Sequence, residues 1–394
     1  MMFAKLNRAA QHQKRVAVLA KQRIRLQQVG VYPAARMAVL ESQLLNHIYT
    51  LTTHDALAEL AGLKLEQLAT QDWQSFCLNA ENAMLIENSN FDLLALCCTQ
   101  LLKSLAPLSI ESLMALGREN PTALNLLLQH PDNWNVQPDT AAINLLLEQP
   151  DNGPAALKYF LLSYIDAPSL VSEALAHSDF ELIYPAFVNA YLSQQTGLTE
   201  QCFVAFARCD NPAQKAQLLA VGGLTGDMRW QEIADEFCRQ HPQYCADVLS
   251  HFQHKSALKL VIGLLDFAPC MAGANSAWLN LTTKALKQVP QLAANGSTAQ
   301  STSNLNMAKR SSSDDAIYAE QQLRQQPGQW VWQGVSYDKA NALPLLRQFA
   351  GLYSQRALCH ALPKAQGAWA FWCANSSTQL WQKMVWQKMS EGAC

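Results

Sequence analysis

Apolar side chains recur along most of this chain at intervals of three and four residues, the period of one face of an α-helix. Strand-type alternation of apolar and polar residues is almost missing. The apolar clusters predict helices at 36–50, 91–103, 121–129, 140–149, 154–165, 170–176, 179–193, 198–208, 213–224, 230–238, 243–252 and 256–267. The pattern therefore predicts an all-α protein.

Short breakers rich in Asp, Asn and Pro separate these segments, as at Asp166-Ala167-Pro168 and Asp210-Asn211-Pro212. An Asp or Asn side chain accepts a hydrogen bond from a free N–H group at a helix start, and Pro suits the first turn. Because the connections are short, we expect successive helices to be antiparallel neighbours.

One sequence segment recurs within the chain, which suggests a repeat, and we call this recurrence the internal echo. Residues 124–133 read LNLLLQHPDN and residues 143–152 read INLLLEQPDN, so seven of ten positions match at an offset of 19. That offset is about one helix and its loop, which is half of a two-helix repeat. The echo favours an α-solenoid of stacked helix pairs.

Composition divides the chain into four regions. A basic helical segment, 1–40, precedes the repeat body, 41–290. Residues 291–315 are rich in Ser and Thr and predict a flexible linker, because they hold too little apolar area to offset the entropy of ordering. Residues 316–394 form a small, predicted helical C-terminal region.

Charge is distributed unevenly. The formal net charge is −2, which argues against nucleic-acid binding through the whole surface. Residues 1–40, however, carry eight basic side chains and no acidic one, so a segment of charge +8 precedes a body of charge −10. This segment either docks on the acidic body or binds an anionic partner or membrane surface. Its expected contact residues are Arg15, Arg23 and Arg25.

The C-terminal region holds six of the ten tryptophans. Trp is enriched at protein interfaces, so this region is a second expected contact element. The alternative is that these rings fill a small helical core. The expected contact residues are Trp330, Trp332, Trp381 and Trp386.

Candidate chemistry is sparse. The sequence has no phosphate-binding P-loop, no nucleophile elbow and no H-E-x-x-H motif. Thiolate and imidazole ligands could hold zinc, but along one helix the candidate side chains do not converge. We therefore expect no metal, no cofactor and no catalytic residue. The weak metal candidates are Cys238, His241 and Cys245, with His251 and His254 farther along.

Cys359-His360 resembles a nucleophile and base, but adjacent helical residues point about 100° apart. His47 and His54 lie near a predicted turn and receive no role. The eleven cysteines form an odd set in apolar contexts, which predicts free buried thiols and a reducing, cytoplasmic location. No apolar run is long enough to span a membrane, and no secretory signal is expected.

The stretch from Asp210 to Asp227 resembles a HEAT-type repeat. An Asn-Pro turn opens the first helix, and Lys215 stands three residues after the proline. A Gly-x-x-Gly-Asp turn follows, in which Gly223 and Gly226 should stop that helix and Asp227 should cap a second helix at 228–239.

A second resemblance involves the tail, where residues 332–336 (WQGVS) precede a predicted helix at 340–350 and residues 354–358 (SQRAL) open another. With the HEAT-like centre and the chain length, this is similar to an uncharacterised bacterial family of HEAT-like proteins associated with type VI secretion clusters. The resemblance implies a non-enzymatic scaffold or adaptor that binds a protein, either a component of the secretion apparatus or an effector that it escorts or neutralises. The alternative function is a nucleic-acid or membrane-surface adaptor acting through the basic segment.

Overall fold

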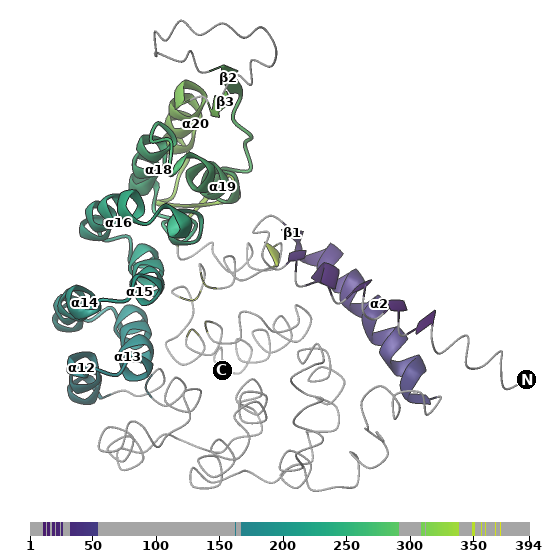
Figure 1. Cartoon of the computed structure of the whole chain (residues 1–394), viewed down its shortest axis with the longest axis horizontal. Helices are drawn as coiled ribbons and strands as arrows, with labels where there is room; N and C mark the ends of the chain where they lie inside the picture. Colours follow the sequence, from purple (N-terminus) through teal and green to yellow (C-terminus); the bar gives the residue numbers. More distant parts are fainter. Residues whose placement is uncertain are drawn as a thin grey trace, which may run out of the picture. The chain divides into compact units, whose positions relative to one another are not determined.

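The computed structural model describes residues 32–53, 167–290, 309–311, 313–338 and 349–350, most positions from 11 to 26, and a few single positions beyond these. The described residues are mostly helical, which confirms the all-α class (Figure 1). The helices are α2 (Ala34–Thr53), α12 (Pro168–Ala176), α13 (Phe180–Ser193), α14 (Thr196–Arg208), α15 (Pro212–Thr225), α16 (Met228–Gln240), η3 (Pro242–Tyr244), α17 (Cys245–Leu249), η4 (Lys255–Ala257), α18 (Leu258–Leu265), α19 (Met271–Thr282) and α20 (Ser313–Gln325). Apart from Leu162, the predicted helices between 91 and 165 lie outside the described residues, as do the internal echo and most of the predicted linker.

The chain divides into two compact units. The first contains residues 1–205 and 343–394, and the second contains Phe206–Ala342. Within the first unit, α12 packs against α13. The same unit joins distant parts of the sequence through a short antiparallel pair, β1 (Tyr32–Pro33) with β6 (Phe349–Ala350).

Local capping explains where the helices of the second unit begin and end. The Asn211 side chain accepts hydrogen bonds from the backbone N–H groups of Ala213 and Gln214, with Pro212 in the first turn, so α15 begins as predicted. Gly226 ends α15 in a left-handed conformation with φ of 76°, which glycine adopts without steric cost. The predicted start of α15 at Asn211 and its end at Gly226 are therefore confirmed, and Asp227 caps α16 as predicted by accepting a hydrogen bond from the Arg229 N–H.

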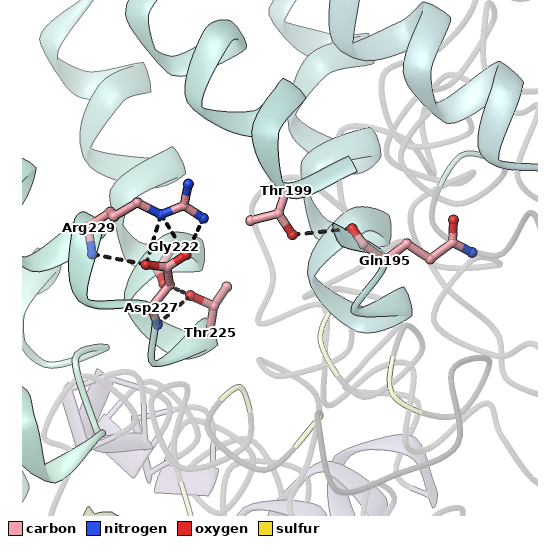
Figure 2. A network of polar contacts seen from close by, with 6 residues as sticks. All are labelled: Gln195, Thr199, Gly222, Thr225, Asp227 and Arg229. Atoms are coloured by element: carbon pink, nitrogen blue, oxygen red, sulfur yellow. Dashed lines mark hydrogen bonds and ion pairs between the residues drawn. The ribbon is translucent and has the colours of Figure 1, made fainter. Parts of the chain in front are cut away.

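The turn after α15 is held by a small polar network (Figure 2). The Thr225 hydroxyl donates to the Gly222 carbonyl at 2.7 Å and accepts from the Asp227 N–H at 3.1 Å. The Asp227 carboxylate accepts from the Arg229 backbone N–H at 2.9 Å and from its guanidinium at 2.6 Å. The Arg229 guanidinium bound to it lowers the pKa of the Asp227 carboxyl. Figure 2 also shows the start of α14, where the Thr199 hydroxyl donates to the Gln195 carbonyl.

The prediction that Gly223 helps to stop α15 is wrong. Both Gly222 and Gly223 lie inside the helix. A Cβ atom on Gly222 would lie 2.6 Å from the Trp230 ring, and one on Gly223 would lie 2.5 Å from the Phe252 ring. The two glycines therefore let large aromatic side chains approach the α15 backbone.

A β-hairpin lies within the C-terminal region, 316–394, that the sequence predicts to be helical. Strand β4 (Trp330–Trp332) pairs antiparallel with β5 (Val335–Tyr337). The two turn residues, Gln333 and Gly334, have φ of 48° and 76°, as the tight turns that favour hairpins require. Each strand has only three residues, and so short an alternation of apolar and polar side chains is not recognisable in the sequence.

Main-chain hydrogen bonds dock this hairpin onto the loop between α17 and α18. The N–H of Val331 donates to the Gln253 carbonyl at 2.8 Å, and the N–H of Lys255 donates to the Gln329 carbonyl at 2.9 Å. The buried Tyr337 hydroxyl lies 3.2 Å from the Gln253 side-chain oxygen, to which it donates. The helical body and the hairpin thus belong to one packed unit.

The last residues of the predicted flexible linker, 291–315, include regular secondary structure. Its residues up to 308 lie outside the described part, but β3 (Lys309–Ser311) pairs antiparallel with β2 (Gln288–Pro290). Helix α20 then begins at Ser313 and packs against α18. Acidic residues Asp314 and Asp315 in its first turn favour a helix start, because they complement the positive end of the helix dipole. Of the helix expected at 340–350, the described residues Phe349–Ala350 form β6 instead.

We expect Gly222→Ala to lower the free energy of unfolding by about 1–3 kcal/mol, because the added methyl group collides with the Trp230 ring. Urea unfolding followed by circular dichroism measures this change. The matched control is Gly263→Ala in α18, where nothing lies within 4 Å of the new methyl group. That substitution should raise stability by up to about 1 kcal/mol through helix propensity. Equal effects of the two substitutions would contradict close packing at Gly222.

Candidate protein-interaction surface

The basic N-terminal segment packs along α2. Every described position from 11 to 26 is helical. Near its start, the Nδ1 atoms of His12 and His47 lie 2.8 Å apart. Near its end, Leu26 packs against Ala34 and Met37. Early residues of the segment therefore meet late residues of α2, so the two form an antiparallel helical hairpin.

A buried ion pair joins the two helices of this hairpin. The Arg23 Nε atom donates to the Glu41 carboxylate at 3.0 Å, and both side chains are fully buried. Glu41 is also the first acidic residue of the chain. Arg23, expected from sequence to contact a partner, is therefore used inside the molecule and is not available at the surface.

A groove of about 400 Å³ runs along this helical hairpin. Its apolar lining contains Leu19 from the N-terminal segment and Val39 and Leu40 from α2. Val39 is 58% exposed although it belongs to the groove, and Val18, next to Leu19 on the N-terminal segment, is also exposed. The polar lining residues are Gln22, Arg36 and Gln43, with Ala35 completing the wall.

Exposed basic side chains are concentrated in the same two helical segments. Arg15 and Arg25, two of the predicted contact residues, are exposed, as are Lys14, Lys21 and Arg36. No acidic side chain precedes the buried Glu41 in the sequence. The surface formed by the described residues 11–43 therefore combines exposed positive charge with an apolar groove, and we call it the basic groove surface.

The tryptophans expected at an interface have different roles. Trp332 is buried in the core of the second unit, which supports the alternative of a Trp-filled core at this position. Trp330 is half-buried and meets the His254 ring edge to face, with centroids 5.3 Å apart. Trp381 and Trp386 lie outside the described residues.

The cysteines and histidines from 238 to 254 are structural within the second unit. Cys238 and Cys245 are fully buried, and the Cys270 thiol donates to the Cys238 carbonyl at 3.0 Å. Neighbouring Cys238 and burial raise the pKa of the Cys245 thiol far above its usual range, so the reactive thiolate is disfavoured. In the described part of the chain, no three His, Cys, Asp or Glu residues are arranged to hold a metal ion.

The histidines of this stretch have distinct structural positions. His241 ends α16, where its ring packs against Phe237 with centroids 4.9 Å apart. His251 is buried, and its Nδ1 atom lies 2.8 Å from the Asp247 carbonyl. His254 accepts a hydrogen bond from the Ser256 N–H and so caps η4. The weak metal candidates are therefore explained by packing and capping.

Of the Cys359-His360 pair, only Cys359 belongs to the described residues. Cys359 is buried, and burial strongly raises the pKa of its thiol. His360 and His54 lie outside the described part. Sequence reasoning also missed the groove-forming Leu19 and Val39, because the groove exists only once two helices lie side by side.

No protein-family model, curated protein or solved structure matches this chain. Among the described helices, none is both long and apolar enough to cross a membrane. The basic groove surface therefore has to be interpreted from its own chemistry.

Replacing Arg23 with Met should lower the free energy of unfolding by about 3–5 kcal/mol, because Glu41 would remain buried without its charge partner. The double variant Arg23→Met/Glu41→Leu should recover most of that loss. The control Lys21→Met changes an exposed charge and should stay within about 0.5 kcal/mol of the parent. Urea unfolding measures all three, and an Arg23→Met effect no larger than the control would refute the buried pair.

Acidification should weaken the helical hairpin through His47. Burial, then the nearby His12 ring and the Arg15 guanidinium, lower the pKa of His47 from the usual 6.5. The folded state therefore binds a proton less readily than the unfolded chain, so the stability from neutral His47 is present above pH 6.5 and is lost as pH falls through the lowered pKa. Between pH 7.5 and 5.5 the urea midpoint should fall more for the parent than for His47→Gln. Parallel losses in the two proteins would contradict this role.

Proposed function

We propose that this protein is a non-enzymatic helical-repeat scaffold that binds a protein partner through the basic groove surface. The observation that carries the proposal is the exposed Arg15, Arg25 and Arg36 beside an apolar groove, in a part of the chain that lacks exposed acidic side chains. Positive charge speeds the approach of an anionic partner, and apolar contact holds it once bound.

The repeat architecture of the proposal is an α-solenoid of HEAT-like helix pairs. Its support is that helices adjacent in sequence pack together, as α12 does with α13 and α15 with α16. The helix starts at Pro212 and Met228 also follow the capping pattern expected of a HEAT-type unit. Stacked pairs of this kind present extended surfaces suited to protein binding.

The cellular setting of the proposal comes from the resemblance of the tail and the HEAT-like centre to a bacterial family. On that basis the scaffold would be a cytoplasmic accessory of type VI secretion. Its partner would be a component of the apparatus or an effector that it escorts or neutralises.

A second function, binding of nucleic acid or an anionic membrane surface, uses the same exposed Arg15 and Arg25. The two functions differ in their salt dependence. Binding to nucleic acid weakens steeply with salt because counterions are released. Binding that also buries apolar surface retains a part that salt does not remove.

The test is purification of the tagged full-length chain from its own cells, with mass spectrometry and the 260/280 nm absorbance ratio as readouts. We expect a discrete protein partner and a protein-like ratio. Arg15→Glu/Arg25→Glu should reduce the partner by at least about tenfold, since several charge contacts reverse sign.

The matched control is Lys284→Glu/Lys287→Glu, which makes the same charge change at two exposed lysines of the second unit. This control should retain the partner. A nucleic-acid-like ratio without a protein, or equal loss in both double variants, would overturn the proposed function.

A further inference from the structure

The wall of the groove contributed by α2 has the spacing of a helix-binding surface. Arg36, Val39, Leu40 and Gln43 line it at intervals of three, four and seven residues. At a rise of 1.5 Å per residue, they extend over about 10 Å, or two helical turns. Leu19 and Gln22 form the opposite wall, one turn apart on the N-terminal segment. Two antiparallel helices with an apolar seam between them leave a place where a third helix can pack.

The polar groups around the seam define the charge of what can bind there. Arg36 lines the groove itself, and Lys14, Arg15, Lys21 and Arg25 are exposed on the neighbouring segment. Glu41, the nearest acidic side chain in sequence, is buried against Arg23 and does not offset this charge at the surface. Gln22 and Gln43 add neutral groups that can donate or accept hydrogen bonds at the rim.

We infer that the groove binds an acidic amphipathic helix of a protein partner, and this inference rests on the proposed function. The apolar side chains of that helix, spaced i, i+3/i+4 and i+7, pack on Leu19, Val39 and Leu40. Its flanking Asp or Glu side chains face Arg36 and the exposed basic residues. This is the helix-in-groove mode of peptide recognition.

The apolar positions favour this occupant over purely anionic surfaces. Val39 is 58% exposed at the groove, and Val18 is 59% exposed on the N-terminal segment. A phosphate backbone gains nothing from aliphatic side chains at these places. A membrane surface takes up protruding apolar faces, whereas Val39 lines a concavity together with Gln22 and Gln43.

The test measures binding of labelled synthetic peptides to the purified full-length chain by fluorescence anisotropy. The probe is an 18-residue peptide with Leu at helical spacing and Glu on both flanks. A second peptide has the same composition with the Leu stripe scrambled, and a third has Lys in place of Glu. We expect the acidic amphipathic peptide to bind at least about tenfold more tightly than either control peptide.

The decisive variant is Val39→Lys, which adds positive charge while removing an apolar contact. Binding of the acidic amphipathic peptide should weaken by about tenfold, because an aliphatic contact is lost. Attraction by charge alone would instead make binding tighter. The matched control is Val204→Lys on α14, which changes a side chain of almost the same exposure, 57%, and should leave the affinity unchanged.

Each of the following outcomes would show that the groove does not bind an acidic amphipathic helix, and would overturn the inference. Equal binding of the amphipathic and scrambled peptides, or tighter binding by Val39→Lys, shows that charge alone acts. Binding to vesicles of phosphatidylcholine and phosphatidylserine without peptide binding shows a membrane surface. Concentration-dependent self-association that Val39→Lys abolishes shows a second copy of this chain. If the cellular partner is still captured while the peptides fail, the scaffold function stands and only the helical occupant is wrong.

Discussion

Within the unit of residues 206–342, buried backbone must find hydrogen-bond partners, and this constraint explains the position of the hairpin. Gln253 and Lys255 are buried, yet the segment between α17 and α18 that contains them forms no α-helix, only the short 3-10 turn η4. Residues 329 and 331 supply the missing main-chain partners. The Lys255 ammonium donates to the Gln326 carbonyl at 2.7 Å, and burial lowers the pKa of this lysine. A buried backbone group left unpaired costs about 1–3 kcal/mol, so the helices and the hairpin depend on each other.

The same principle governs the N-terminal helical hairpin, where the buried group is a charge. Arg23 and Glu41 come from neighbouring helical segments and are both removed from water. The rest of the positive charge is not neutralised within residues 11–43 and stays at the surface. One arginine therefore orients the segment, while the others define its outer chemistry.

Local features of the fold could be predicted from the sequence because their causes lie within one turn of chain. Asn211 and Asp227 begin helices through hydrogen bonds to residues two or three positions away, and Gly226 ends α15 through its own left-handed backbone conformation. The hairpin at 330–337 could not be predicted in this way, because its strands have three residues each and its partners lie about eighty residues earlier. Gly223 shows the ambiguity directly, since a glycine that ends a helix and one that admits an aromatic ring look alike in sequence.

The candidate site likewise has some features that the sequence predicts and others that depend on residues far apart in the chain. Counting charges identified the basic segment, including the exposed Arg15 and Arg25. The burial of Arg23 could not be predicted, since it depends on Glu41 eighteen residues away on the next helix. The groove likewise requires Leu19 and Val39 to lie across from each other, which only the packed helical hairpin brings about.

The buried ion pair has a consequence for the energetics of recognition. A basic segment that became helical only on meeting its partner would lose conformational entropy at that moment, and affinity would fall accordingly. Here the segment is already folded against α2, with Arg23 anchored and the exposed arginines at fixed helical spacing. Most of the ordering cost is met when the chain folds, so the surface is preorganised and its selectivity resides in geometry as much as in charge.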